Sequence, residues 1–212
     1  MSTPAFHKDN FHDYCDQLAA RDELFAGVLS QYGYPPCYSR AVSFETLIHI
    51  ILEQQVSLAS ARAAMDRLKD RLRNKITPDR LLTLTDTELK SCYFSRQKTA
   101  YARNLATAVL DKTVQLKKYP EMSNETIRGE LTAVKGIGNW TVDIFLMMAL
   151  HRTDLFPLGD IALLNSVRHL RALPANSPKE TIAMIAEEWK PLRTIAAYYC
   201  WHAYICRKGL RF

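Results

Sequence analysis

One stretch of this chain constrains its fold more than any other: LTAVKGIGNWTVDIFLMMALHRTDLFPLGD, at residues 131–160. Its pattern predicts a short amphipathic helix, a tight turn through Gly136 and Gly138, and a very apolar helix from about Asn139. Free N–H groups at the start of that second helix favour an anion such as a phosphate. A carboxylate, Asp160, ends the stretch. The stretch therefore predicts an anion-binding hairpin with an acid placed beyond it.

The rest of the chain is also patterned for helices. A loose terminus at residues 1–9 is expected to precede a single helix over residues 10–32. Helix-start signals follow at Ser43, Ser57, Thr85 and Ser177, and the last two have the form of capping boxes. We find no alternating strand pattern, no internal repeat and no low-complexity linker. The expected fold class is all-α.

Composition narrows the class of protein. The 212 residues are 48% hydrophobic and 24% charged, which predicts a globular, soluble protein. No apolar run approaches the length needed to cross a bilayer, and residues 1–20 lack the features of a secretion signal. The net charge of +6 suits a polyanionic partner.

The cysteines predict free thiols in a reducing compartment, because they are scattered and odd in number. They are Cys15, Cys37, Cys92, Cys200 and Cys206. His202 lies between the last two, but on a helix Cys200 and His202 would point in different directions, which argues against a metal site. The sequence also lacks a P-loop, a GxSxG and an HExxH motif.

The hairpin and the acid together resemble a known family. LTAVKGIGNWT followed by FPLGD is similar to the helix-hairpin-helix and Gly/Pro-Asp motif of the HhH-GPD DNA glycosylases, and within that superfamily to the 3-methyladenine DNA glycosylase II branch. IILEQQVSLASA resembles the family's early helix–loop–helix, and KPLRTIAAYYCWHAY its C-terminal helix. The resemblance covers residues 43–205 and is to the short, single-domain members. It implies one domain over residues 1–212, built of two helical lobes (about 43–150, and 1–42 with 151–212) with a cleft between them.

The resemblance implies a monofunctional DNA glycosylase of base excision repair. Such an enzyme flips an alkylated purine, of the 3-methyladenine or 7-methylguanine type, out of double-stranded DNA and hydrolyses its N-glycosidic bond to leave an abasic site. Asp160 would be the catalytic residue, because a carboxylate stabilises the positive charge that develops on the sugar. Asp160 is also a good helix N-cap, and both roles can hold together. Trp140 stands where strand-cutting relatives carry a Schiff-base lysine, so no lyase activity is expected.

The resemblance also implies a base pocket with Trp140, Trp201 and Ile144. Trp201 matches an aromatic residue that lines the pocket, and aromatic faces attract cationic methylated purines. Trp140, Asp160 and Trp201 are expected to surround one pocket, although a core role is the alternative for Trp140. Ile144 replaces a second pocket aromatic. Another lesion, such as hypoxanthine or a mismatched or oxidised base, therefore remains an alternative substrate.

DNA contacts are expected from the hairpin and from one turn. Gln55 falls where relatives place the residue that fills the gap left by a flipped base, and a solvent-facing glutamine is the alternative. Ser57 is expected to contact a phosphate or to cap a helix. The hairpin would contribute the backbone N–H groups of Gly136, Ile137 and Gly138, with Lys135 beside them. Arg96, Lys98 and Arg103 are further candidates for phosphate contacts.

The remaining expectations concern cofactors, partners and location. Backbone carbonyls of Thr132, Val134 and Ile137 would hold a monovalent cation, sodium or potassium, as in the family. No other cofactor is expected, and an iron–sulfur cluster would need four cysteines near the C-terminus where this chain has two. The partner is double-stranded DNA containing damaged bases, bound by a monomer, in the bacterial cytoplasm at the nucleoid or in a eukaryotic nucleus. A non-catalytic DNA-binding protein is the second alternative, and loss of Asp160 would be its signature.

Overall fold

The structure, a computed structural model, describes residues 4–210. Helices make up most of these residues, and no strand occurs among them apart from one isolated bridge between Ala5 and Arg152. The all-α prediction is therefore confirmed. No helix within the described range is both long and apolar enough to span a membrane. The chain divides into two compact units: the first contains Arg40–Phe145, and the second contains Pro4–Ser39 and Leu146–Phe212.

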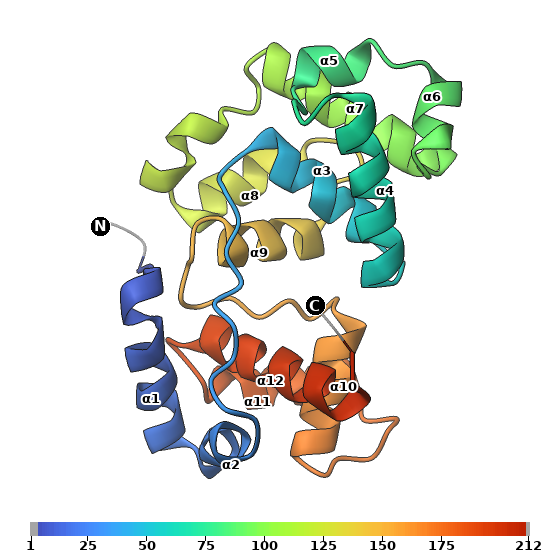
Figure 1. The fold of residues 1–212 in the computed structure, drawn as a ribbon. Coiled ribbons are helices and arrows are strands. Elements are labelled where there is room, and N and C mark those ends of the chain that lie inside the picture. The colour runs from blue at the N-terminus through green and yellow to red at the C-terminus, as the bar shows by residue number, and fades with distance from the viewer. Residues whose placement is uncertain (1–3, 211–212) are drawn as a thin grey trace. The chain divides into compact units, whose positions relative to one another are not determined.

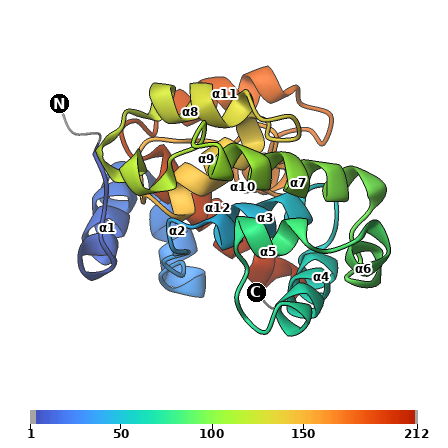
Figure 2. The ribbon, with the colours of Figure 1, turned by 90° about the horizontal axis from the view of Figure 1, so that it is seen from above.

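The first unit is built around α3, which is apolar on most sides and almost completely buried. Its helices are α3 (Phe44–Glu53), α4 (Leu58–Arg71), α5 (Pro78–Leu82), α6 (Asp86–Ser91), α7 (Arg96–Leu110), the 3₁₀ helix η2 (Leu116–Glu121), α8 (Asn124–Thr132) and most of α9 (Asn139–Met148). The long helix α7 packs against α3, α5 and α6 (Figures 1 and 2). Burial of α3 by its neighbours fixes where the turns at its two ends lie.

Local capping signals set most helix starts in this unit. The hydroxyls of Ser43, Ser57 and Ser123 each accept a backbone N–H of their own helix. Thr85 and Glu88 form the predicted capping box in full. Each such cap satisfies a backbone donor that the first helical turn would otherwise leave unpaired.

The second unit is organised around α12. Its helices are η1 (Lys8–Asn10, 3₁₀), α1 (Phe11–Arg21), α2 (Glu23–Tyr32), α10 (Ile161–Leu170), α11 (Lys179–Glu187) and α12 (Arg193–Lys208). Residues 195–200 of α12 are wholly buried, because the helix packs against α1, α2, α10 and α11. Figure 1 shows α12 in red, beside α10 and α11.

Two predictions about the N-terminal segment are wrong. Residues 4–9 are not loose, because Phe6 is fully buried and its N–H donates to the carbonyl of His151 at 3.0 Å; residues 1–3 lie outside the described range. The predicted helix over residues 10–32 is broken at Asp22, whose backbone is extended (φ −143°). The Asp22 carboxylate caps α2 and accepts from Arg171 and Trp189, so distant residues favour the break.

The predicted capping box at Ser177 is also wrong. Helix α11 begins one residue later than expected, with Pro178 in the N-cap position and no side-chain cap. The N–H of Ser177 instead donates to the carbonyl of Pro174 at 2.9 Å. A local turn therefore displaces the box, although the sequence has the right spacing.

Candidate functional site

The hairpin of the first unit is a pair of tight turns between α8 and α9. The N–H of Val134 donates to the carbonyl of Leu131 at 3.1 Å, and that of Ile137 donates to the carbonyl of Val134 at 3.0 Å. All three side chains are buried, so the turns are anchored from beneath by apolar contacts. The chain then enters α9 at Asn139.

Gly136 is required at its position for two separate reasons. Its φ is +107°, which side-chain-bearing residues rarely adopt. A Cβ built there would lie 2.1 Å from Cγ of Tyr101, inside the ring's contact distance. Gly138 differs, because its φ is not positive and nothing lies within 4 Å of a Cβ built on it. The tight turn therefore depends on Gly136, whereas Gly138 leaves open space just before α9.

Three side chains that belong to no predicted motif hold the hairpin in place. Gln54 donates from Nε2 to the carbonyl of Gly136 and to Oγ1 of Thr141, both at 3.0 Å. Asn104 donates to the carbonyl of Lys135 at 3.1 Å. Arg128 of α8 binds Asn139 and Asp143 of α9. The polar Gln54, directly after the largely apolar helix α3, is the signal that the sequence offered.

These bonds decide which backbone groups the hairpin can offer to a ligand. The Ile137 N–H donates inside the turn, which leaves the N–H groups of Gly136, Gly138 and the first turn of α9 as the donors that the hairpin can offer. Gln54 and Asn104 donate to the carbonyls of Gly136 and Lys135, and the Val134 carbonyl accepts the Ile137 N–H inside the turn. Each carbonyl oxygen has two lone pairs, so even Val134 keeps one. Residues 4–210 contain no cluster of His, Cys, Asp or Glu suited to a metal ion.

The turn between α3 and α4 presents Gln55 outward. Gln55 is exposed and has φ +56°, a left-handed conformation that costs roughly 1–2 kcal/mol for a residue other than glycine. Strain of this kind is typical of functional turns. Ser57, the next candidate along, caps α4 by accepting the N–H of Ser60 at 3.2 Å. The N-cap expectation for Ser57 is thus confirmed.

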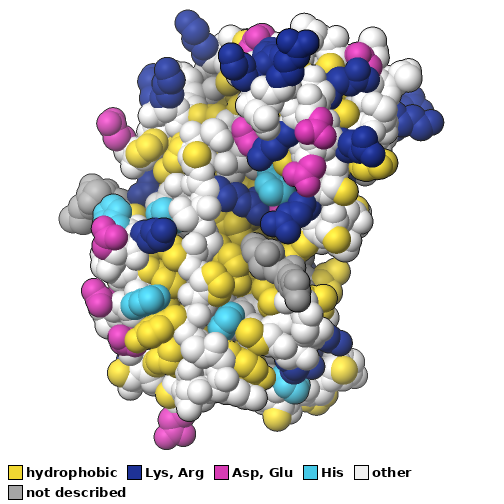
Figure 3. All heavy atoms as spheres, viewed as in Figure 1, with side chains coloured by type: hydrophobic (Ala, Val, Ile, Leu, Met, Phe, Trp, Pro, Cys, Tyr) yellow, Lys and Arg dark blue, Asp and Glu magenta, His cyan; other side chains and the backbone are white. Residues whose placement is uncertain are grey.

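Basic residues are concentrated in the first unit. It carries 17 Lys and Arg against 12 Asp and Glu, whereas the second unit carries 11 against 10. Figure 3 shows Lys and Arg side chains gathered over the helices of the first unit. Among the candidates for phosphate contacts, Arg96 and Lys135 are exposed. A protein surface with this excess of positive charge favours a polyanion.

Two of the candidates for phosphate contacts have hydrogen-bond partners within the first unit. Lys98 donates to the carbonyl of Leu52 at the end of α3, at 2.6 Å, and burial lowers the pKa of its ammonium group. Arg103 donates to the carbonyl of Leu84 and to Asp86. Their positive charges are directed at helix ends and an acid of the same unit.

Asp160 lies in the second unit, where it is the N-cap of α10. Its Oδ1 accepts the backbone N–H of Leu163 at 2.8 Å, and its own N–H closes a turn onto Pro157 at 2.9 Å. The same Oδ1 accepts the indole N–H of Trp201 at 3.3 Å. The side chain is partly exposed. The N-cap expectation is confirmed, and Asp160 and Trp201 are brought together.

Trp201 belongs to a packed group of aromatic side chains on and beside α12. Its ring is stacked on Tyr198, with centroids 5.8 Å apart, and meets Tyr38 edge-on at 6.0 Å. Trp201 is 7% exposed. Tyr198, Tyr199 and Trp189 are also buried, so they pack in the core of this unit.

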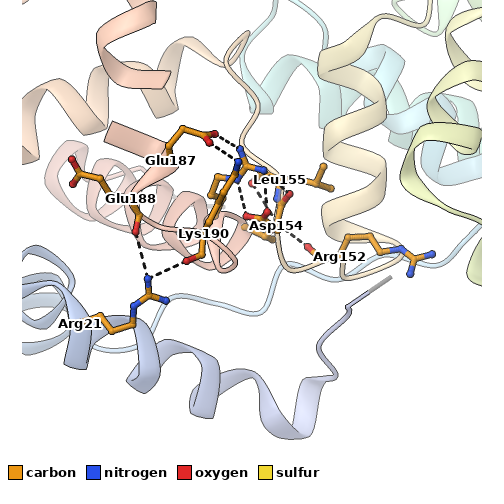
Figure 4. A network of polar contacts seen from close by, with 9 residues as sticks. Arg21, Arg152, Asp154, Leu155, Glu187, Glu188 and Lys190 are labelled. Atoms are coloured by element: carbon orange, nitrogen blue, oxygen red, sulfur yellow. Dashed lines mark hydrogen bonds and ion pairs between the residues drawn. The ribbon is translucent and has the colours of Figure 1, made fainter. Parts of the chain in front are cut away.

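The backbone that leads to Asp160 is clamped by the first turn of α12 (Figure 4). Arg193 makes a bidentate ion pair with Asp154, at 2.7 and 3.0 Å. The hydroxyl of Thr194 donates to the carbonyl of Arg152 at 2.6 Å and accepts the N–H of Leu155 at 3.1 Å. Arg152, Asp154 and Leu155 are thus fixed a few residues before the carboxylate.

The other two pocket candidates lie on α9 in the first unit. Trp140 is partly exposed and sits in the first turn of the helix, directly after Asn139. Ile144, one turn further on, is 3% exposed. The distribution of the candidates is therefore Trp140 and Ile144 in the first unit, and Asp160 and Trp201 in the second.

Comparison with known proteins shows the family to which the chain is similar. The family model described as "HhH-GPD superfamily base excision DNA repair protein" matches residues 48–191. The chain is 32% identical over 161 residues to DNA-3-methyladenine glycosylase 1 of Schizosaccharomyces pombe, covering 74% of this chain and 71% of that protein.

Solved structures are similar over most of the chain. A 3-methyladenine DNA glycosylase of Schizosaccharomyces pombe in complex with abasic DNA matches with a TM-score of 0.83 and 29% identity, over 89% of this chain and 95% of that one. A DNA-3-methyladenine glycosidase from Bacillus halodurans matches with a TM-score of 0.75 and 25% identity, over 92% and 91% of the two chains.

Proposed function

Because the chain belongs to the HhH-GPD superfamily of base excision DNA repair proteins, we propose that it is a monofunctional DNA glycosylase for alkylated purines. It binds double-stranded DNA, takes up a 3-methyladenine or 7-methylguanine base and hydrolyses the N-glycosidic bond. The products are the free base and an abasic site. One observation carries the proposal: a chain similar to 3-methyladenine glycosylases has both the Gly136 hairpin and a carboxylate at Asp160.

Asp160 is the proposed catalytic residue. Breaking the bond leaves positive charge on the sugar, and a carboxylate close to C1′ stabilises that charge. It also orients or deprotonates the attacking water. A methylated purine already carries positive charge and leaves readily, so little acid catalysis is needed. The N-cap bond from Leu163 supports this role, because it anchors one carboxylate oxygen at the start of α10.

Aromatic side chains are proposed to receive the damaged base. The faces of Trp140 and Trp201 attract a cationic purine and stack on its flat ring. Ile144 contributes an apolar contact one turn after Trp140. With tryptophan rather than lysine at position 140, no Schiff base forms with the sugar, and the enzyme does not cut the strand.

The hairpin is proposed to bind one DNA phosphate. The Gly138 N–H and the first turn of α9 donate to it, Lys135 adds positive charge, and a monovalent cation on the Thr132, Val134 and Ile137 carbonyls strengthens the attraction. Gln55 is the proposed wedge that fills the gap left by the flipped base, and its left-handed backbone and exposure support that role. Ser57 makes a nearby phosphate contact from the same turn.

A second lesion class is a specific alternative. Ile144 is aliphatic where the resemblance implies an aromatic pocket residue, and this weakens the preference for cationic bases. Hypoxanthine or a mismatched or oxidised base is the substrate in that case. The protein acts as a monomer and works where the DNA is, at the nucleoid or in the nucleus.

Release of labelled base from methylated duplex DNA tests the proposal directly. Free 3-methyladenine or 7-methylguanine is expected in the supernatant, with alkali-sensitive abasic sites in the DNA. Absence of release from every alkylated substrate, with release of hypoxanthine instead, would favour the alternative. Borohydride should trap no covalent DNA adduct, and a trapped adduct would refute the monofunctional assignment.

A further inference from the structure

The indole of Trp201 is directed at the carboxylate that the proposed function makes catalytic. Two donors converge on a single oxygen, Oδ1 of Asp160: the backbone N–H of Leu163 at 2.8 Å and Nε1 of Trp201 at 3.3 Å. The first donor belongs to α10 and the second to α12. One hydrogen bond lets a carboxylate pivot about the bonded oxygen, whereas a second donor from another helix restrains the pivot.

Trp201 is itself held firmly enough to act in this way. Its ring packs on Tyr198 and against the edge of Tyr38. Tyr198 is fully buried, and its hydroxyl lies 3.0 Å from the carbonyl oxygens of both Tyr38 and Met147. These contacts tie the indole to two further backbone segments of the same unit. The direction of its N–H is therefore set before any DNA binds.

An indole has one hydrogen-bond donor and no acceptor. With its N–H engaged by Asp160, Trp201 can contact a base only through its ring face. The ring face of Trp201 can therefore contact a base while its N–H orients Asp160, and the two effects can be tested separately.

We propose that Trp201 is a positioning residue for Asp160, in addition to any contact it makes with the base. This inference rests on the proposed function, because it assigns Trp201 an effect on catalysis that acts through the Asp160 carboxylate. Small displacements of a reacting group lower rates strongly, so the indole N–H contributes to the rate of bond cleavage rather than to DNA affinity.

The test removes the N–H and keeps the ring. Trp201 is replaced site-specifically by 3-benzothienylalanine, in which sulfur takes the place of the N–H group. The matched control is the same replacement at Trp189, a buried tryptophan of this unit whose indole N–H donates to Oδ2 of Asp22 at 3.1 Å. Single-turnover base release from 7-methylguanine DNA and the Kd for abasic DNA are measured for both proteins.

The expected result is a roughly tenfold lower rate of release at Trp201 with an unchanged Kd, because about one hydrogen bond is lost. The Trp189 protein should stay within about twofold of wild type, since its bond lies elsewhere. The inference would be overturned by a release rate within twofold of wild type for the Trp201 protein. It would also be overturned by an equal loss of rate for the Trp189 protein, or by weaker binding of abasic DNA with no change in rate.

A second measurement separates this inference from the proposed function. In the Asp160→Asn background, the Trp201 replacement should cause no further loss of rate, because its effect passes through the acid. A further tenfold loss there would show that Trp201 acts independently of Asp160 and would refute positioning. If Asp160→Asn alone left the rate unchanged, the catalytic role of Asp160 would fail instead.

Discussion

The two glycines of the hairpin should respond to alanine in opposite ways. Gly136→Ala places a Cβ 2.1 Å from the Tyr101 ring and forces a side chain onto a backbone with φ +107°. The backbone conformation costs roughly 1–3 kcal/mol for a residue other than glycine. Displacing a packed ring costs about 1–3 kcal/mol more, and here Gln97 also holds the Tyr101 hydroxyl at 2.6 Å. The expected loss of unfolding free energy is therefore roughly 2–6 kcal/mol.

Gly138→Ala is the control, because nothing lies within 4 Å of its Cβ and its φ is not positive. Alanine is a somewhat poorer residue than glycine just before a helix, so the expected loss is about 1 kcal/mol at most. The methyl group does, however, occupy the open space beside the first turn of α9. Gly138→Ala should therefore stay folded and bind DNA more weakly.

Urea unfolding followed by circular dichroism measures the stability of both variants, and fluorescence anisotropy with an abasic duplex measures binding. In a Tyr101→Ala background, Gly136→Ala should cost roughly 1–3 kcal/mol less unfolding free energy than it does in the wild-type protein, because no ring is displaced. Equal losses of stability for the two glycine variants would refute the assignment of the turn to Gly136. If Gly136→Ala cost no stability at all in the Tyr101→Ala background, that result would also refute the assignment, because the positive φ of Gly136 should still carry a cost.

Three further predictions concern the supports of the site. Thr194→Val should lose about 2–4 kcal/mol of unfolding free energy, because it removes two buried hydrogen bonds of the Thr194 hydroxyl, to the Arg152 carbonyl and from the Leu155 N–H. Tyr199→Phe, which loses one bond to Cys15, should lose about 1 kcal/mol. Chemical unfolding compares the two variants, and equal losses would contradict the clamp. Gln54→Leu should destabilise the first unit by about 1–2 kcal/mol and weaken DNA binding, while Gln55→Leu should leave stability unchanged within about 0.5 kcal/mol. The backbone N–H of Thr85, and to a lesser extent its hydroxyl, hydrogen-bond to the Glu88 carboxylate and lower its pKa from 4.5. The capping box therefore contributes stability above pH 4.5, and this contribution is lost as the pH falls below that value. Glu88→Gln should flatten that part of the pH–stability curve, and an unchanged slope would contradict the linkage.

Features encoded by neighbouring residues were predictable from the sequence. The caps at Ser43 and Ser57 and the capping box at Thr85 follow from local hydrogen-bonding chemistry, and the structure confirms them. The turn at Gly136 and the capping role of Asp160 were predictable for the same reason.

Features that depend on distant partners were not predictable in this way. Asp22 breaks the first helix because it meets Arg171 and Trp189, which lie far along the chain. Phe6 is buried against the segment after α9, and Gln54 reaches across to the hairpin. No local pattern of residues encodes these pairings, so a single sequence gives only the weak signal of a polar residue at the end of an apolar helix.

The central claim is that the Asp160 carboxylate promotes cleavage of the N-glycosidic bond. Asp160→Asn tests it cleanly, because asparagine is as good an N-cap as aspartate and its carbonyl oxygen can accept from both Leu163 and Trp201. The measurement is single-turnover release of 7-methylguanine by each protein, with binding to abasic DNA as the check on folding. The variant should bind abasic DNA and release the base roughly 100-fold or more slowly than wild type. Release by Asp160→Asn at the wild-type rate would contradict the claim.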